Sequence, residues 1–379
     1  MSLQAANHEW TLAMDSVPHP EWSDFDKKLA AMASVVQSAG CDRLVLRRQP
    51  NLSYLVGGRS NVPQTLDSAC FDLILEAGSE PKATVVTNAI EARRLAATEL
   101  AGAPVEWDIV DWWADRSQRL PAGRGVASDG GIPDTTDLSA QVATVRRSLT
   151  PHQQGQLREL CTDAASAATR SATRLTPYTT EYQAAGIFAG ELLAGAMDPI
   201  VLLVAGKERM GRDRHPLPST AAVGDRAMLV GCARRHGLVA SVTRIISFTS
   251  LSASEGERYD ALLRVEADFL NASLPGVSLG EVVSSAVTAY GREGFDPQEW
   301  HHHHQGGFTG WEPREFPARP TSSELIQLNG MLGWNPSAAG WKVEDTCLIT
   351  ANGPDPLVHD SSWPTRVIAG RERPGVLEV

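Results

Sequence analysis

Apolar strand-like segments are grouped in the second half of the 379-residue chain, and this grouping limits the possible folds more than any other pattern in the sequence. Ile200–Ala205, Ala227–Cys232 and Leu238–Phe248 succeed one another, and Asp345–Thr350 comes later. Strands that are grouped, and do not alternate strictly with helices, favour antiparallel pairing. We therefore predict an α+β domain with a curved, mostly antiparallel sheet backed by helices.

The backing helices are predicted from their capping sequences. A Ser or Thr followed three residues later by Glu or Gln lets side chains and backbone at a helix start satisfy one another. This pattern opens helices at Thr180–Gln183, Ser254–Glu257 and Ser278–Glu281, and a fourth helix begins at Thr150 with Pro151 as its first residue.

The first half of the chain alternates strand-like and helical segments, which predicts a smaller α/β domain. Ser23 and Asp24 can cap a first helix, and Asn88 can cap a second that runs to about Leu100. The strands are expected at Arg43–Arg47, Ser53–Gly57, Asp72–Glu76, Ala83–Thr87 and Val105–Val110. The Gly- and Pro-rich stretch Pro121–Asp137 marks a boundary or an exposed loop. We expect an N-terminal arm at 1–22 and domains at 23–145 and 146–379.

Composition narrows the class of protein. Hydrophobic residues make up 42% and charged residues 21%, as in globular proteins. A net charge of −11 argues against a nucleic-acid partner, and no apolar run reaches the ~18–20 residues of a membrane span. No signal peptide is apparent, and five scattered cysteines without a CxxC pair indicate reduced thiols. We predict a cytoplasmic protein without nucleic-acid or membrane partners.

The most unusual segment is WHHHHQGGFTGWEPREFP at 300–317. Histidine titrates near neutral pH and serves as a general acid–base group or as a metal ligand. Four consecutive rings on a loop cannot all face one site, so at most two are functional. His303 and His304, beside the glycines, are the better candidates; the alternative is a solvated loop with incidental histidines.

Two further segments carry candidate groups. His215 lies in RHPLP at a loop after a buried strand, and Glu344 with Asp345 precedes an apolar strand. A lone histidine is more often structural, and a Glu–Asp pair at a strand start is usually a solvated edge. The chain has no HExxH, no GxxxxGK[ST] and no GxGxxG after a strand, which disfavours zinc-protease, ATP and NAD chemistry.

Taken together, these segments resemble the pita-bread superfamily of aminopeptidase P, prolidase, methionine aminopeptidase and creatinase over nearly the whole chain. Residues 23–58 resemble the start of the creatinase-type N-terminal domain, including an N-x-x-Y-L-x-G stretch at Asn51–Gly57. RHPLP falls at the family's substrate-side histidine. VEDTCLIT resembles the family's terminal R-x-E-D-T strand, with Lys342 at the arginine position.

The departures from the family concern its metal ligands. Family metallopeptidases hold two divalent ions with two aspartates, one histidine and two glutamates. Here the positions of three acidic ligands carry Val230, Ser241 and Asn335, while His304 is the nearest match to the histidine and Glu344 matches the last glutamate. Hard cations need charged oxygen ligands. The resemblance therefore disfavours a metal-dependent aminopeptidase, and we predict neither a metal nor another cofactor.

Creatinase is the family precedent for catalysis without metal, and it implies hydrolysis of a C–N bond by histidine acid–base chemistry. We predict catalytic roles for His304, His303 and Glu344, with Glu344 orienting the imidazole. Arg314 and Glu315 fall near the family's His-Glu pair, and arginine there favours a small substrate with a carboxylate; amides and amidines also fit. The predicted substrate-binding set is His215, Arg314, Glu315, Asn335, Arg244, Tyr54 and Arg59.

Two other functions stay open at this point. A non-catalytic pseudo-peptidase that binds a ligand or a protein partner uses the same fold, and a lyase or isomerase uses the same acid–base pair. The resemblance also implies a homodimer.

Overall fold

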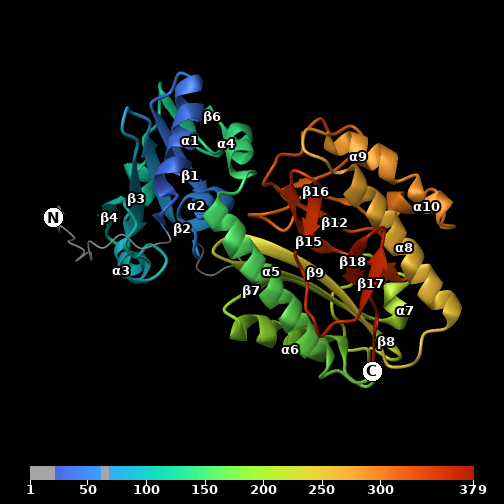
Figure 1. The fold of residues 1–379 in the computed structure, drawn as a ribbon. Coiled ribbons are helices and arrows are strands. Elements are labelled where there is room, and N and C mark those ends of the chain that lie inside the picture. Colours follow the sequence, from blue (N-terminus) through green and yellow to red (C-terminus); the bar gives the residue numbers. More distant parts are fainter. Residues whose placement is uncertain (1–21, 61–67) are drawn as a thin grey trace. The chain divides into compact units, whose positions relative to one another are not determined.

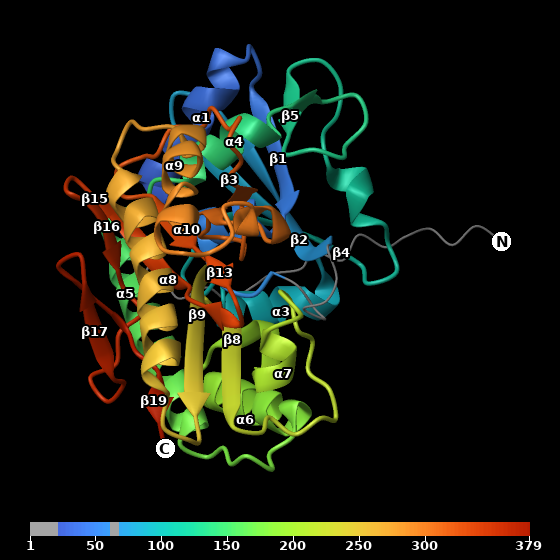
Figure 2. The same ribbon diagram turned by 90° about the vertical axis from the view of Figure 1, so that its right-hand side faces the viewer.

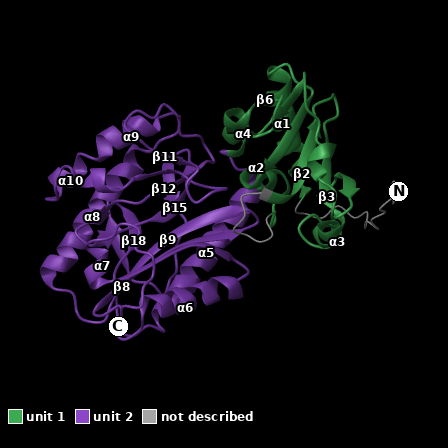
Figure 3. Cartoon of the chain, turned by 180° about the vertical axis from the view of Figure 1, so that it is seen from behind, with its two compact units in different colours: residues 1–146 green, residues 147–379 purple. Residues whose placement is uncertain are grey.

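A computed structural model of the chain describes residues 22–60 and 68–379, so the predicted arm lies outside the described residues except for Trp22. The chain forms two compact units, one ending at Arg146 and the other beginning at Arg147 (Figure 3). The sequence prediction divided the chain between residues 145 and 146. The two units are described in turn.

The first unit contains a mixed six-stranded sheet in the order β4-β3-β2-β1-β5-β6 (Figure 1). Its strands β1 and β2 and its strands β2 and β3 pair antiparallel, and the other pairs are parallel. The strands are β1 Arg43–Arg48, β2 Ser68–Glu76, β3 Lys82–Asn88, β4 Glu106–Val110, β5 Val126–Ser128 and β6 Thr136–Asp137. The helices are α1 Phe25–Ser38, α2 Gln49–Val56, α3 Ala89–Ala97 and α4 Ser139–Arg146, with the 3-10 helix η2 Arg116–Arg119.

Two predictions for the first unit were wrong. Most of the expected strand Ser53–Gly57 lies in helix α2, in which Pro50 occupies the first turn and Pro50–Val56 is buried. Of the two alternatives for Pro121–Asp137, the domain boundary is excluded, because the segment contributes the short strands β5 and β6 to the sheet between partly exposed loops. Asp24 makes no side-chain cap for α1; its carboxylate pairs with Lys28 at 2.9 Å. Asn88 does cap α3, which ends at Ala97.

The second unit is built on a nine-stranded sheet whose main path is β11-β10-β12-β15-β9-β8-β7, with β16 beside β15 and β19 beside β9. Only β19 pairs parallel among the described strands of this sheet. The long strands bend across the unit (Figure 1). The predicted α+β class with a curved, mostly antiparallel sheet is confirmed.

The bounds of the second unit's elements follow chain order. The strands are β7 Asp198–Gly206, β8 Arg226–Arg235, β9 Leu238–Ser247, β10 Gly306–Phe308, β11 Phe316–Pro317, β12 Met331–Trp334, β13 Ser337–Ala338, β14 Trp341–Lys342, β15 Asp345–Thr350, β16 Gly353–Pro356, β17 Thr365–Ile368, β18 Arg371–Pro374 and β19 Leu377–Glu378. The helices are α5 Pro151–Ala172, α6 Glu181–Ala194, α7 Lys207–Met210, α8 Ala253–Ala272, α9 Leu279–Ala286 and α10 Ala289–Arg292, with the 3-10 helix η3 Glu299–His302.

Four capping boxes start the long helices of this unit. Those at Thr180 and Ser278 are confirmed, and Thr150 forms a further box with Gln153. The box of α8 lies at Ser252 and Glu255, two residues before the predicted one. Serines at 252 and 254 each have a glutamate three residues on, so the local pattern alone did not distinguish them.

The two faces of strands β8 and β9 have different neighbours. A side chain at Gly231 would meet the Phe188 ring of α6, so Gly231 lies on the face that α6 covers. Its neighbours Val230 and Cys232 therefore lie on the opposite face, together with Thr243 and Ser241, to which they are paired. The candidate site lies on this second face (Figure 2 gives the turned view of these strands).

The core of the second unit joins the sheet to the C-terminal helices. Leu262, Phe269 and Trp334 are almost fully buried in one cluster of apolar side chains, and the Trp334 and Phe269 rings lie 4.9 Å apart. Over residues 22–60 and 68–379, none of the helices combines the length and apolar character that a bilayer crossing requires.

Candidate functional site

A short hairpin, β13–β14, positions two groups of polar side chains. Ala339 and Gly340 form its turn with φ of 50° and 83°, and positive φ at both turn residues matches the twist of a two-residue hairpin. Ser337 and Lys342 therefore stand opposite each other. Ser337 contacts a cluster of histidines and Lys342 contacts Glu344, so one hairpin supports both groups.

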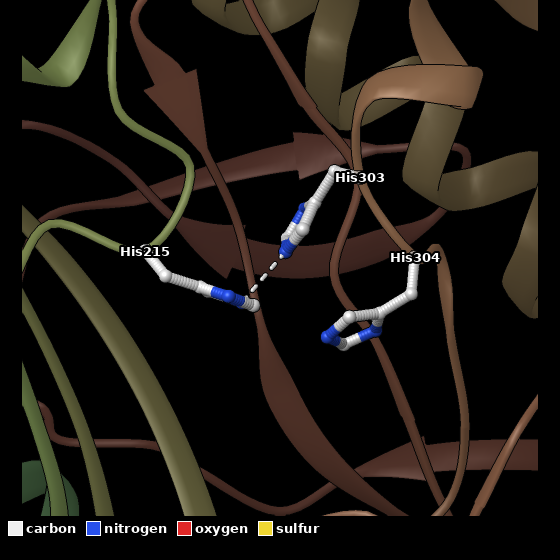
Figure 4. A group of neighbouring side chains, drawn as sticks. All are labelled: His215, His303 and His304. Atoms are coloured by element: carbon white, nitrogen blue, oxygen red, sulfur yellow. Dashed lines mark hydrogen bonds between the residues drawn. The ribbon is translucent and has the colours of Figure 1, made fainter.

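The histidine cluster consists of His215, His303 and His304, whose rings converge from two loops (Figure 4). Nε2 of His303 lies 3.1 Å from Nε2 of His215, and Nδ1 of His303 lies 3.1 Å from the hydroxyl of Ser337. The ring centroids of His303 and His304 are 4.6 Å apart. His303 is buried, whereas His215 and His304 are more exposed. The other two histidines of the run, His301 and His302, are exposed.

Buried contacts hold the two loops in place. Arg214 forms an ion pair with Glu299, which ties the His215 loop to η3. The Tyr290 hydroxyl donates to Oε1 of Gln305 at 2.7 Å, and the Gln305 amide donates to the carbonyl of His303. Histidine positions on both loops are thus fixed by neighbours outside the cluster.

The environment keeps the imidazoles neutral. Burial, followed by the nearby Lys342 charge, lowers the pKa of His303 to about 2. Burial and Arg314 lower the pKa of His304 to about 4, and burial and Lys342 lower that of His215. Every ring in the cluster therefore offers nitrogen lone pairs at neutral pH, with the ring proton of each neutral imidazole on one nitrogen only.

Glu344 is held by two cations. Its Oε1 accepts from Arg314 at 2.7 Å and its Oε2 accepts from Lys342 at 2.5 Å, and Lys342 also donates to Thr243. Although burial opposes ionisation, Lys342 and Arg314 lower the pKa of Glu344 to about 2. Two positive charges thus meet one negative charge.

The predicted imidazole–carboxylate pair is not formed. The Glu344 carboxylate contacts Arg314 and Lys342, and no hydrogen bond joins it to His303 or His304 within the described part of the chain. Arg314 also donates to the carbonyls of Gly307 and Gly333, so both terminal nitrogens of its guanidinium donate to protein groups. Both residues therefore act on the histidines through their charges.

The family's dinuclear metal centre does not fit these residues. Val230 and Ser241 are buried, and the Ser241 hydroxyl lies 3.5 Å from the Cys232 sulfur. Oδ1 of Asn335 is buried without a hydrogen-bond partner among the described residues, but it is a neutral oxygen. The one carboxylate, Glu344, already holds two cations. Two divalent ions would lack the charged oxygens they require.

Of the other predicted site residues, two make different contacts within the second unit and two belong to the first unit. Arg244 points to the opposite face of β9, where it binds Asp345 at 2.8 Å and the carbonyl of Val358. Glu315 accepts from the backbone of Trp311. Tyr54 and Arg59 belong to the first unit, in which Tyr54 is buried.

The glycines after the histidine run are needed for sheet packing. Gly306 and Gly307 have φ of 121° and 139°, a region that side chains rarely adopt. A Cβ at Gly306 would lie 2.2 Å from the carbonyl of Gly333, and one at Gly307 would lie 2.2 Å from the carbonyl of Phe316. Strand β10 can therefore pack between β11 and β12 only with glycine at both positions.

Sequence reasoning missed Ser337 and the ion pairs of Lys342 and Arg314 with Glu344. Lys342 and Glu344 are two residues apart in an extended segment, a spacing that places both on one side, so this pair had a local signal. Ser337 and His303 are 34 residues apart, and no local pattern connects them.

Comparisons with known proteins agree with this architecture. The probable dipeptidase PepE of Mycobacterium tuberculosis is 24% identical over 87% of this chain and 93% of its own length. The crystal structure of dipeptidase PepE from Mycobacterium ulcerans matches 96% of this chain and 99% of its own, with a TM-score of 0.73 and 18% identity. The prolidase of Pyrococcus horikoshii matches 88% and 98%, with a TM-score of 0.73 and 15% identity. This chain has the pita-bread fold.

No profile of a known protein family matches the chain. The fold that the sequence resemblance to the pita-bread superfamily implies is nevertheless confirmed by these neighbours. At the positions where that resemblance places the family's metal-binding carboxylates, this chain has Val230, Ser241 and Asn335.

Proposed function

We propose that this pita-bread protein is a hydrolase that cleaves a C–N bond of a small, carboxylate-bearing substrate without the family's dinuclear metal centre. One observation carries the proposal: neutral imidazoles converge beside Glu344, and the two cations on Glu344 are protein side chains. Arg314 and Lys342 supply positive charge where family metallopeptidases use metal ions. The peptidase names of the relatives support a hydrolase and a peptide-like substrate.

The proposed reaction uses one imidazole twice. A ring nitrogen of His304 or His215 accepts a proton as water oxygen bonds to the carbon of the scissile amide. The imidazolium then returns that proton to the substrate nitrogen as the C–N bond breaks. His303 has Ser337 on one nitrogen and His215 on the other, so its role is to orient His215 and to pass a proton along the pair.

Charge supports the choice of substrate. Arg314 and Lys342 exceed Glu344 by one positive charge, and in a partly desolvated site such an excess attracts an anion. The carboxylate of a dipeptide or an N-acyl amino acid satisfies this requirement. The orphaned Oδ1 of Asn335 is a candidate acceptor for a substrate N–H.

A non-catalytic ligand-binding protein is the second candidate, favoured by the loss of family ligands at Val230, Ser241 and Asn335. It predicts binding of the same anions without turnover. A lyase or isomerase would instead release products without incorporating solvent oxygen.

The test is a screen of dipeptides, N-acyl amino acids and amidines with chelator-treated protein in H₂¹⁸O, followed by single variants. We expect hydrolysis with ¹⁸O in the product, and a loss of ~10²–10⁴ in kcat for His304→Ala. His303→Ala should act in the same direction, and His301→Ala, on an exposed neighbour, should have full activity. Full activity in both His303→Ala and His304→Ala would end the proposal, and binding without turnover would favour the second candidate.

Two further predictions concern the cellular location and the oligomeric state of the protein. We propose a cytoplasmic location, supported by five free, buried cysteines. We also propose a homodimer, on the family resemblance alone; the solution mass of the purified protein tests it.

A further inference from the structure

The histidine cluster has the composition of a transition-metal site. Its three ring-nitrogen ligands lie within 4.8 Å of one another, and the closest pair, Nε2 of His215 and Nε2 of His303, is separated by 3.1 Å. Nitrogens around a tetrahedral Zn²⁺, with Zn–N bonds of ~2.0–2.1 Å, lie roughly 3.3 Å apart. The separation of the His215 and His303 nitrogens is thus already close to that of two zinc ligands.

The buried ring already has the support that metal-ligating histidines use. Nδ1 of His303 contacts the Ser337 hydroxyl, which leaves Nε2 directed at the cluster. Metal-bound histidines engage their other nitrogen in this way, and the contact helps to fix the ring orientation. Ser337 itself is fixed opposite Lys342 in the β13–β14 hairpin.

We propose that His215, His303 and His304 bind one transition-metal ion, of the class of Zn²⁺, with three imidazole ligands in place of the carboxylate-rich ligand set of the family's dinuclear centre. Three imidazoles suit zinc, copper, nickel or iron, whereas Mg²⁺ and Ca²⁺ prefer oxygen ligands. Three protein ligands leave a fourth coordination position for water or an anion.

The nearby charges make this ion exchangeable. Arg314 and Lys342 outweigh Glu344 by one positive charge, and a positive surplus weakens the binding of a cation. The site is thus suited to reversible occupancy. This consequence rests on the proposed function: a bound ion takes the lone pairs that acid–base catalysis needs, so zinc inhibits the hydrolase.

The experiment measures zinc binding directly, independent of any substrate. Chelator-treated protein is titrated with Zn²⁺ by calorimetry, and with Co²⁺ to record the visible absorption of a tetrahedral site. We expect one equivalent, no comparable binding of Mg²⁺, and a Kd raised by ~100-fold or more in His303→Ala. His301→Ala is the matched control, since it removes an exposed ring from the same run, and its Kd should be unchanged. His304→Ala provides a second variant in case His303→Ala does not fold.

Absence of stoichiometric binding, or equal effects of His301→Ala and the His303 or His304 variants, would overturn the site. An activity assay separates this proposal from the previous one. Inhibition that follows zinc occupancy supports both. Activation by zinc would overturn metal-independent hydrolysis while the site stands, and occupancy with no change in activity would overturn the inhibitory role.

Discussion

Glu344 and Asp345 are consecutive carboxylates that point to opposite sides of the sheet, and each contacts two cations. Asp345 binds Arg244 and Arg373, and Arg373 also holds Glu266 through two hydrogen bonds of 2.5 and 2.7 Å. There two cations meet two buried carboxylates, and the charges balance. On the Glu344 side the cations exceed the carboxylate by one, and three imidazoles lie nearby.

The difference separates a structural ion network from a candidate site. A balanced, fully buried network has no charge left for a ligand, and its members fix the fold. An unbalanced group next to groups with free lone pairs can still interact with an anion or a metal. Identical local chemistry, a carboxylate with two cations, thus has different uses on the two faces.

The largest expected effect concerns the charge-balanced network of Asp345, Glu266, Arg244 and Arg373. Arg373→Met leaves Glu266 and Asp345 with less compensation in the interior, and we expect a loss of ~3–5 kcal/mol in the free energy of unfolding. Arg314→Met leaves Glu344 paired with Lys342, so a loss of about 1–3 kcal/mol is expected. Urea unfolding at pH 7 measures both. Arg158→Met, which removes an exposed pair with Asp355, is the control and should cost less than ~1 kcal/mol. Equal losses of unfolding free energy in Arg373→Met and Arg314→Met would contradict the distinction between the balanced network and the Glu344 group.

Acid titration probes the group of Glu344, Arg314 and Lys342, in which the positive charges exceed the negative charge by one. The pKa of Glu344 in the fold is about 2, below its ordinary value of 4.5, so its ionised form stabilises the fold above about pH 4.5. This contribution, about 3 kcal/mol, is lost as pH falls from 4.5 to 2. Unfolding free energies of the wild type and Glu344→Gln should therefore converge by that amount over this range. A constant difference between them would contradict the assignment of the shift to Glu344.

The hairpin's contribution to the histidine cluster is tested with Ser337→Ala. Loss of the hydroxyl frees the His303 ring to rotate, and we expect zinc affinity to fall ~10–100-fold. Thr346→Val removes another buried hydroxyl, on strand β15, one that accepts from the backbone of Ser241. That control should alter stability and leave zinc affinity unchanged. Equal zinc affinity in wild type and Ser337→Ala would mean that His303 is oriented by other contacts.

The smallest expected effect is an increase in zinc affinity. Lys342→Gln removes a positive charge near the cluster, so zinc should bind more tightly, by about 1 kcal/mol or roughly 5-fold. Calorimetric titration of the two proteins at one ionic strength measures the change. Weaker binding in the variant would show that Lys342 supports the cluster through its contacts more than it opposes the ion through its charge.

The fold was largely predictable because its signals are local. Grouped apolar segments gave the antiparallel sheet, and the capping boxes at Thr180 and Ser278 located helix starts. The failures have local causes as well. The sequence of Ser53–Gly57 is typical of a strand. Pro50 in the first turn and the burial of nearly all of α2 nevertheless stabilise a helix there.

The site was predictable only in part. Histidines 303 and 304 stand out by composition, and His215 entered through the family resemblance. Their association joins residues 88 positions apart, and Arg314 meets Glu344 across 30 positions. Such contacts depend on strand register, and no local sequence pattern predicts that register. The prediction of an imidazole–carboxylate pair was wrong for the same reason, because Glu344 is instead hydrogen-bonded to Arg314 and Lys342.

The β13–β14 hairpin makes the spacing between Ser337 and Lys342 a diagnostic that can be applied to other sequences. Because side chains alternate along a strand, inserting or deleting one residue at Ala339–Gly340 would put one of the two side chains on the wrong side. A related chain that keeps a hydroxyl residue, a two-residue turn and a lysine at this separation is therefore expected to assemble both the histidine cluster and the Glu344 ion pairs. A chain with a different turn length is expected to lose one of them, even if every histidine is present.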